Sequence, residues 1–283
     1  MDFSGLTRTA RPPACVLTLE DLRRLYTELD RKSVEALEKF LSAQVRPPTT
    51  AASDFEKLKQ QARDLGHVTV TVTGYSGEFL VARSADVLST EYLPHRLRSV
   101  SYDNTTGLQT SNVSLSNRLS VQLDFSEPPG FNVYDPWSQP TPNTSRIEVL
   151  GPDDTWVSAT YQTVVDFFNG RRRARSWLHG EVAFNLLNWF VGIPGALWTT
   201  VRIDQHFLNP LTKLPSGLRT AADIYLFLLG MFVFRAMFYG LRWMFPVVEL
   251  EGARSRSARN TVGAIIGGLL LALAYDVLKA LFL

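Results

Sequence analysis

Sulfur and imidazole side chains are scarce in this chain. Its 283 residues include one cysteine, Cys15, so no disulfide forms within the chain, as is typical of a reducing compartment. The four histidines are scattered, and no two stand at the spacing of metal ligands. We therefore expect neither a bound metal nor another cofactor.

The motifs of common enzymes are also missing. The chain has no G-x-S-x-G elbow, no Walker A loop and no G-x-G-x-x-G loop. Asp153 and Asp154 stand in a turn before a predicted helix, where capping explains them. We interpret the polar residues of 66–170 as structural or solvated, and the expectation is that the protein is not an enzyme.

A secretory signal is not evident, because the N-terminus has no apolar core. Long apolar runs are confined to 177–283, whereas 1–176 is polar and mixed. This contrast predicts an N-terminal helical segment and linker (1–65), an α+β soluble domain (66–170) and a membrane region (171–283).

Residues 262–283 form an apolar run of 22 residues, and about 20 suffice for a helix to cross a bilayer. Twelve of them are Val, Ile, Leu or Phe, which together favour insertion by about 5 kcal/mol. Asp276 and Lys279 are three residues apart, where they can pair, and Lys279 can reach the interface. The run predicts a membrane span, with a buried helix of a soluble core as the alternative. Asp276 lining a pore or proton path is a further hypothesis.

A second span is predicted at 222–242. It contains Arg235, an intramembrane charge that needs protein, water or a headgroup beside it. Arg235, Arg242 and Trp243 are expected to mark its interfacial end, and Pro246 follows.

The segment 181–201 is shorter in apolar residues and contains Asn185, Asn188 and Pro194. It predicts either a kinked span or a re-entrant or interfacial segment, so the membrane region has two or three spans. With three spans, most arginines that flank the spans fall on one side. The positive-inside rule then favours three spans with 1–176 and 242–260 cytoplasmic and 203–220 opposite.

Basic residues immediately precede the first apolar segment. Such residues attract anionic lipid, and tryptophan prefers the same depth, so lipid headgroup contact is favoured over nucleic acid. The residues in question are Arg171, Arg172, Arg173, Arg175 and Trp177.

Small residues form one face at the start of the terminal run. Gly263 and Gly267 make a G-x-x-x-G pair, and Ala264 and Gly268 repeat the spacing. Such faces let helix backbones approach closely, so this face predicts self-association into a homo-oligomer or packing on the second span.

Helix signals open the soluble part. Thr18 and Asp21 resemble an N-cap and its acidic partner, ahead of an apolar stripe that is interrupted at Ser33. A linker at 46–53 is followed by a second capping box, Ser53 with Glu56, and by a helix that Gly66 can close.

From His67 onward, alternating β-branched residues predict about five mostly antiparallel strands. One covering helix follows within 155–170, with Gly170 as its stop. The loop 126–145 is rich in Pro and Ser and contains Phe131, Tyr134 and Trp137, which either pin the loop or carry function.

The leading functional hypothesis is a membrane-anchored sensor or interaction module. Its cytosolic α+β domain would bind a protein or small molecule through 66–170, and its spans would self-associate. A pore-forming or membrane-perturbing effector is the alternative, and an enzyme acting on a membrane substrate is the weakest reading. The preference for arginine over lysine hints at a bacterial source, hence a multi-pass protein of the bacterial inner membrane.

Overall fold

The computed structural model describes residues 5–89, 91, 93–109, 115–128, 141, 143–205 and 215–252, with 261, 263–265, 267, 268 and 279. The chain divides into two compact units. The α+β unit comprises Met1–Ser126, Asn143–Ala174 and Val247–Ala253. The helical unit comprises Glu127–Pro142, Arg175–Pro246 and Arg254–Leu283.

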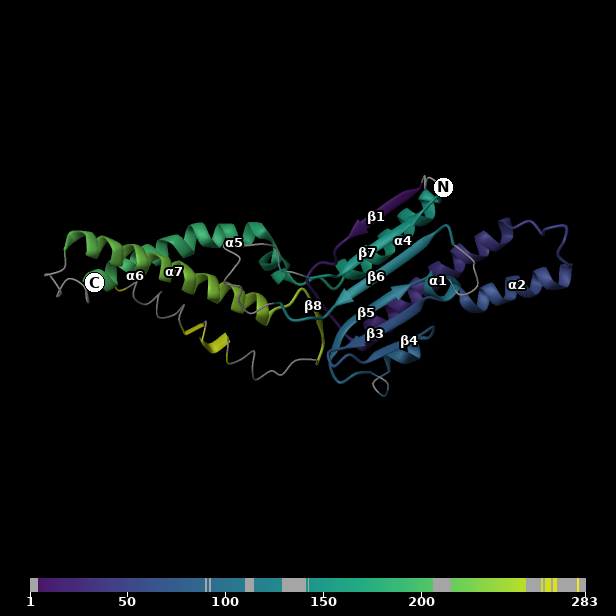
Figure 1. The fold of residues 1–283 in the computed structure, drawn as a ribbon, viewed down its shortest axis with the longest axis horizontal. Coiled ribbons are helices and arrows are strands. Elements are labelled where there is room, and N and C mark those ends of the chain that lie inside the picture. The colour runs from purple at the N-terminus through teal and green to yellow at the C-terminus, as the bar shows by residue number, and fades with distance from the viewer. Residues whose placement is uncertain are drawn as a thin grey trace. The chain divides into compact units, whose positions relative to one another are not determined.

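A six-stranded sheet forms the centre of the α+β unit, and all of its strand pairs are antiparallel (Figure 1). In spatial order its strands are β1 (Leu6–Ala10), β7 (Arg146–Gly151), β6 (Arg118–Asp124), β5 (Leu97–Asp103), β3 (Thr69–Gly74) and β4 (Phe79–Ala82). The predicted antiparallel α+β architecture is confirmed. About five strands were expected, and β1 is the additional one, a short outer strand paired with β7.

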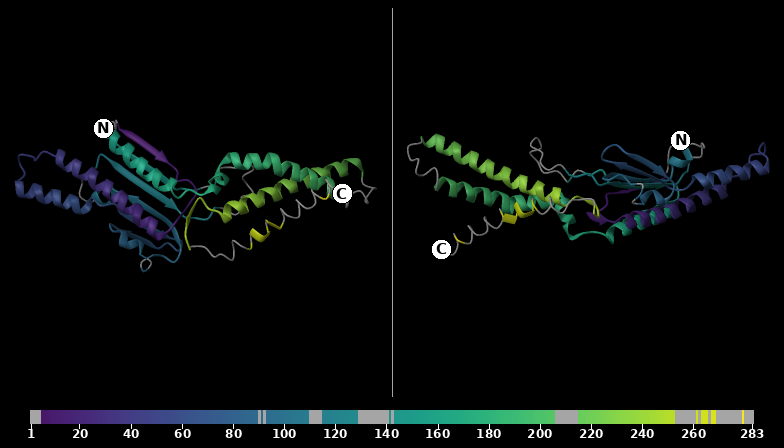
Figure 2. Two further views of the ribbon diagram at one scale, coloured as in Figure 1. Left: turned by 180° about the vertical axis from the view of Figure 1, so that it is seen from behind. Right: turned by 90° about the horizontal axis from the view of Figure 1, so that it is seen from below.

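The core lies between this sheet and two helices, α1 (Leu19–Ala43) and α4 (Asp154–Asn169), which lie against the same face (Figure 2). Every second residue of the strands points into the core: Val70, Val100 and Val121 are fully buried. Leu25 of α1 and Phe168 of α4 pack against them. The alternation of the sequence therefore reflects one covered and one open sheet face.

The ends of α1 and α4 follow their sequence signals. The Thr18 side chain accepts a hydrogen bond from Asp21 N, and Asp21 accepts one from Thr18 N, both at 3.0 Å. Asp153 caps α4 by accepting from Trp156 N. Ser33, which interrupts the apolar stripe, is buried and donates to Gly66 O at 2.8 Å, so it joins α1 to the end of the second helix.

The second helix, α2 (Ala52–Leu65), begins earlier than predicted. Its N-cap is Ala51, which makes no side-chain capping bond, and Gly66 is its C-cap as expected. The predicted capping box of Ser53 and Glu56 is wrong, because Ser53 already lies inside the helix. Two short helical segments also belong to the α+β unit: η1 (Ala85–Leu88) and α3 (Thr106–Gln109).

Asp124, at the end of β6, forms hydrogen bonds with both chain segments that border residues 127–142. Its carboxylate accepts hydrogen bonds from Ser126 N at 2.9 Å, from Thr144 N at 3.0 Å and from Thr144 Oγ1 at 2.8 Å. Asn143 Nδ2 donates to Asp124 O. The chain therefore leaves the α+β unit after Ser126 and re-enters it at Asn143, and the residues at both places are hydrogen-bonded to Asp124.

Replacing Asp124 with Asn is expected to destabilise the fold at neutral pH by roughly 1–3 kcal/mol, because buried donors lose a charged acceptor. Burial acts to raise the pKa of Asp124, but hydrogen bonds from Ser126 and Thr144 outweigh it, so the pKa lies below its ordinary value. A lowered folded-state pKa stabilises the protein above the unfolded value of about 3.9, and this stabilisation disappears as the pH falls through the folded-state pKa.

Thermal unfolding of the protein in detergent should therefore show a gap between wild type and Asp124→Asn that narrows as the pH drops below about 4. Asp54→Asn, at a solvent-exposed carboxylate, is the control and should leave the midpoint unchanged. A gap that is constant with pH would mean that the charge of Asp124 contributes nothing.

Strand β2 (Cys15–Leu17) joins the two chain segments that border 175–246. It pairs in parallel with β8 (Val248–Leu250), which follows that stretch. Cys15 N donates to Val247 O at 2.9 Å, and Arg173 N donates to the adjacent Ala14 O at 3.0 Å. Both ends of 175–246 are thus fastened at neighbouring residues of the α+β unit.

Candidate membrane-associating helical hairpin

Two helices of the helical unit are long and apolar enough to cross a membrane. The first runs over Val182–Ile203, with a mean hydropathy of 1.2, and the second is α7 (Ser216–Met244), with a mean hydropathy of 1.8. At a rise of about 1.5 Å per residue, even the shorter one spans about 33 Å, against a hydrocarbon core of about 30 Å.

The first helix is built from α5 (Glu181–Leu187), a π-helical turn η3 (Asn188–Gly192) and α6 (Ile193–Ile203). A short 3-10 segment, η2 (Ala174–His179), precedes it. Pro194 lies in the first turn of α6, directly after the π turn, so its missing N–H is accommodated without breaking the helix. Of the two forms expected for 181–201, the structure has a continuous helix of crossing length.

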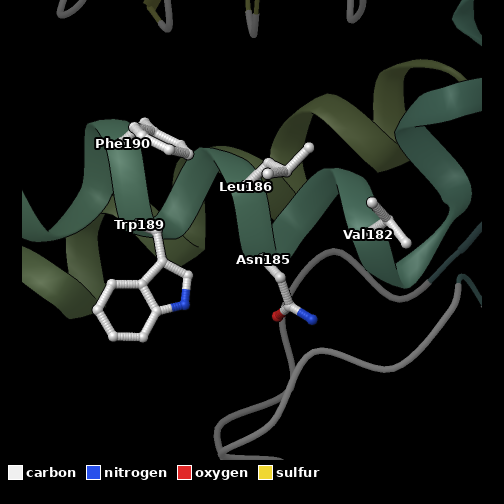
Figure 3. Close-up of a pocket in the computed structure, with 5 residues that line it drawn as sticks. All are labelled: Val182, Asn185, Leu186, Trp189 and Phe190. Carbon is white, nitrogen blue, oxygen red and sulfur yellow. The ribbon is translucent and has the colours of Figure 1, made fainter.

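Large apolar side chains cover the outside of both helices. In the most hydrophobic windows, only 22% of the first helix and 11% of α7 are buried, whereas a core helix of a soluble protein is mostly buried. Figure 3 shows part of this surface along α5 and the π turn, where Trp189 is 67% and Phe190 76% exposed. An apolar surface of this extent fits lipid or a partner better than water.

Small residues bring α6 and α7 together, and the two helices run side by side in Figures 1 and 2. A Cβ added to Gly230 would meet Ala196 Cα and Cβ at 3.0 Å, and one added to Gly192 would meet the Phe234 ring at 2.8 Å. Gly192 and Ala196 are four apart, as in a small-xxx-small face. The contact between α6 and α7 was not predicted from the sequence, although the four-residue spacing of Gly192 and Ala196 indicates such a contact.

Gly230→Ile is expected to force α6 and α7 apart and to lower the stability of the hairpin by roughly 1–3 kcal/mol, because the neighbouring atoms are helix backbone and a methyl group with no room to move. Gly217→Ile on the same helix is the matched control, since a Cβ there has open space. Thermal unfolding in detergent compares the two variants. Equal midpoints would show that close approach at Gly230 is unimportant.

Arg242 lies deep inside the helical unit. Its side chain is 2% exposed, and its guanidinium donates to Leu178 O and to Gly180 O, both at 3.2 Å. It also lies over the Phe238 ring, 4.5 Å from the centroid. Two carbonyls just before α5 therefore bind the Arg242 side chain, and its expected position at a membrane interface stays a prediction. Its neighbour Trp243 donates to Glu127 Oε2 at 3.2 Å.

Other polar groups of the hairpin are buried without a hydrogen bond to the part of the chain that the structure describes. They are Asn188 Oδ1, Asp223 Oδ1, and Nε and Nη2 of Arg235. Arg235 lies 5.5 Å from the centre of the Tyr239 ring. Arg219 and Asp204 form a bidentate ion pair that joins the end of α6 to the start of α7. Its shorter contact is 2.6 Å, from Arg219 Nη2 to Asp204 Oδ2.

The basic residues at 171–175 differ in their surroundings. Arg171 binds Asp21 at 2.6 Å and lies 3.7 Å from the Phe167 ring centre, so its charge is engaged within the α+β unit. Burial acts to raise the pKa of Asp21, but hydrogen bonds from Arg171 and Thr18 outweigh it and lower the pKa. Arg172 and Arg173 are exposed, as is Trp177 at 57%, and the side chain of Arg175 is outside the described part.

The predicted terminal span is described at only a few positions. Gly263, Ala264, Ile265, Gly267, Gly268 and Lys279 are helical where described, whereas Asp276 and the flanking residues lie outside the described residues. A Cβ on Gly263 would lie 3.7 Å from Met244 Sδ, and one on Gly267 or Gly268 would meet nothing within 4 Å. Phe131, Tyr134 and Trp137 of the loop 126–145 also lie outside the described residues.

Comparison of the chain with protein-family models, with curated proteins and with solved structures finds no match. Within the described ranges, no group of three or more His, Cys, Asp or Glu residues is placed to hold a metal ion.

Proposed function

We propose that this protein is a membrane-anchored interaction module in which the hairpin 175–246 crosses the bilayer twice and holds the α+β unit at one surface. The observation that carries this proposal is the fastening of both hairpin ends at Ala14 and Cys15. Because neighbouring residues hold both ends, the chain must leave and return on the same side of a membrane.

The same fastening favours one of the two topologies that the sequence leaves open. If 181–201 were interfacial and only α7 crossed, Arg173 and Val247 would lie on opposite sides, so the pairing of β2 with β8 supports two crossings. Two crossings place the connection 206–214 on the far side. The apolar run 262–283 then adds a third span, whose end emerges on that far side.

The orientation follows from charge. Arg172, Arg173 and Arg175 precede the hairpin, and Arg254 follows it, all on the side of the α+β unit. Cytoplasmic loops carry the basic excess, so the α+β unit faces the cytoplasm, as in a bacterial inner membrane. Exposed Arg172 and Arg173, with Arg175 and Trp177, contact lipid headgroups, and Arg171 remains with Asp21.

The open face of the sheet is the surface we assign to a ligand, most simply a protein. It carries short polar side chains such as Thr71 and Ser101, which are cross-strand partners. At its edge Phe79 and Val81 on β4 are 65% and 51% exposed. An exposed edge strand offers free backbone groups that a partner strand can pair with.

The proposal predicts that the full-length protein stays with membranes through alkaline carbonate washing and is released only by detergent. Release by carbonate or by high salt would mean peripheral attachment, and the hairpin would then pack against protein instead.

A pore is the second candidate, and the buried polar atoms of Asn188, Asp223 and Arg235 favour it, since polar groups inside spans often mark ion paths. Dye or ion leakage from vesicles that contain the purified protein, lost in Arg235→Leu, would support a pore. Vesicles that do not leak at any protein density would exclude a pore and support the anchored module.

A further inference from the structure

Basic side chains gather at one end of the central sheet. This is the end at which β3 and β6 finish and β5 begins, as the pairing of these strands shows. The segment 93–98 at the start of β5 contains no acidic residue, and its three basic ones, His95, Arg96 and Arg98, are exposed. Arg96 lies over the ring of Tyr75 in the turn that follows β3, 4.8 Å from the ring centre, and Tyr75 is 39% exposed.

The chain leaves the α+β unit beside these arginines. Phe125 N donates to Arg98 O at 2.8 Å, and Ser126 is the last residue of this segment in the α+β unit. The next residue, Glu127, accepts the hydrogen bond from Trp243 near the end of α7. Arg98 therefore lies next to the short stretch of chain that leads to the end of a helix proposed to cross the membrane.

A further exposed arginine lies at the same end of the sheet, next to the other place where the chain leaves the α+β unit. Arg11 follows β1, which ends where β7 begins and β6 finishes. Nearby in the sequence, Ala14 O accepts the hydrogen bond from Arg173 N, and Arg173 leads into the hairpin. The strands β7 and β6 lie between β1 and β5, so the two basic sites are separated by roughly 14 Å at about 4.8 Å per strand.

Acidic groups at this end offset only part of its positive charge. The Asp124 carboxylate is occupied by its bonds to Ser126 and Thr144, and Glu78 accepts a hydrogen bond from Ser76 N at 3.1 Å. Glu251, which follows β8, is exposed. The exposed arginines at this end of the α+β unit are Arg11, Arg96, Arg98, Arg172 and Arg173. This end therefore has a net positive charge.

We propose that the basic end, defined as Arg11, Tyr75, Arg96 and Arg98, is a second contact of the α+β unit with anionic lipid headgroups. The inference rests on the proposed insertion of the hairpin in a bilayer, and its residues are distant in sequence from 171–177. Because the chain passes from this end into the hairpin, these side chains lie within reach of the headgroups. Tyrosine favours the membrane interface, and an anionic leaflet attracts arginine. Two separated contacts hold this end of the sheet toward the membrane.

Fluorescence quenching in vesicles tests the proposal with the full-length protein in a Cys15→Ser background. A fluorophore is attached at Ser76→Cys, in the exposed turn beside Tyr75, and the vesicles contain lipid with a nitroxide on its headgroup. We expect strong quenching in vesicles that contain phosphatidylglycerol and little in vesicles of phosphatidylcholine alone. The control is the same label at Val45→Cys, which is 86% exposed and lies beyond the end of α1. It should stay unquenched in both kinds of vesicle.

The double variant Arg96→Gln with Arg98→Gln should lower the ratio of docked to undocked label by roughly 25-fold, because each arginine near an anionic surface favours docking by about fivefold. Arg96→Lys with Arg98→Lys keeps both charges and should keep most of the quenching, which separates the charge from a structural role. The matched control is Arg31→Gln with Lys57→Gln, which removes two exposed cations from α1 and α2 and should behave as wild type.

Quenching that is equal with and without phosphatidylglycerol, or that the glutamine variant retains, would overturn the proposal. Heparin added to phosphatidylcholine vesicles detects a soluble polyanion as the partner instead. A fluorescence change with heparin that the glutamine variant loses, without any lipid-dependent quenching, would also overturn it. Carbonate extraction of the same samples scores membrane insertion separately, so an inserted protein without quenching refutes the second contact and not the anchor.

Discussion

Replacing 175–246 with a short Gly/Ser linker, in a chain that stops after Ala253, is expected to give a water-soluble protein that keeps the fold of the α+β unit. Arg173 and Val247 are held by Ala14 and Cys15, which are adjacent, so a few flexible residues bridge the gap. The change removes the exposed apolar helices and the terminal apolar run. These surfaces would otherwise cause the protein to aggregate in water.

A matched chain that stops at Ala174 is the control, because it also lacks the hairpin but loses β8. Val248 is fully buried and Leu250 nearly so, and their removal exposes the core around Leu17. Burial of two such side chains is worth roughly 3–6 kcal/mol, so this chain should be markedly less stable or unfolded. Thermal unfolding and gel filtration compare the two chains. Equal stability would show that β8 does not belong to the α+β unit.

Arg242→Met is expected to be among the most damaging single substitutions in the helical unit, costing roughly 2–5 kcal/mol. The guanidinium donates to the carbonyls of Leu178 and Gly180, and methionine leaves the carbonyl of the buried Leu178 without this donor and removes the bond to Gly180. The start of α5 would then lose its attachment to α7. The measurement is the unfolding midpoint of the purified protein in detergent.

Arg202→Met is the control for Arg242→Met, since Arg202 lies on α6 over Trp198 and is not among the buried residues. A midpoint for Arg242→Met that matches this control would mean that water or lipid replaces the guanidinium at the two carbonyls. Lysine at 242 should rescue part of the loss, because a single ammonium can reach one carbonyl but has no second planar donor group.

Local signals predicted the elements that depend on nearby residues. The caps at Thr18 and Asp153 need only residues two or three positions away, and the alternation in 66–125 needs only a covered face. The predicted capping box at Ser53 was wrong because the helix starts two residues earlier, with Ala51 as its N-cap, where the sequence carries no cap signal.

Features that depend on distant partners were missed. The three residues of β8 form a strand only because β2, more than 200 residues earlier, pairs with them. The carbonyl partners of Arg242 were not predicted, because only the fold brings Leu178 and Gly180 to it. Gly230 meets Ala196 for the same reason: the hairpin brings them together.

The central claim is that both ends of the hairpin lie on one side of the membrane and the turn between its helices on the other. Single cysteines at Val45, Glu251 and Ser216 in a Cys15→Ser background test it directly, because all three positions are solvent-exposed. In sealed, right-side-out vesicles, a membrane-impermeant maleimide should label position 216 and spare 45 and 251 until detergent is added. Labelling of 216 and 251 from the same side would contradict the double crossing.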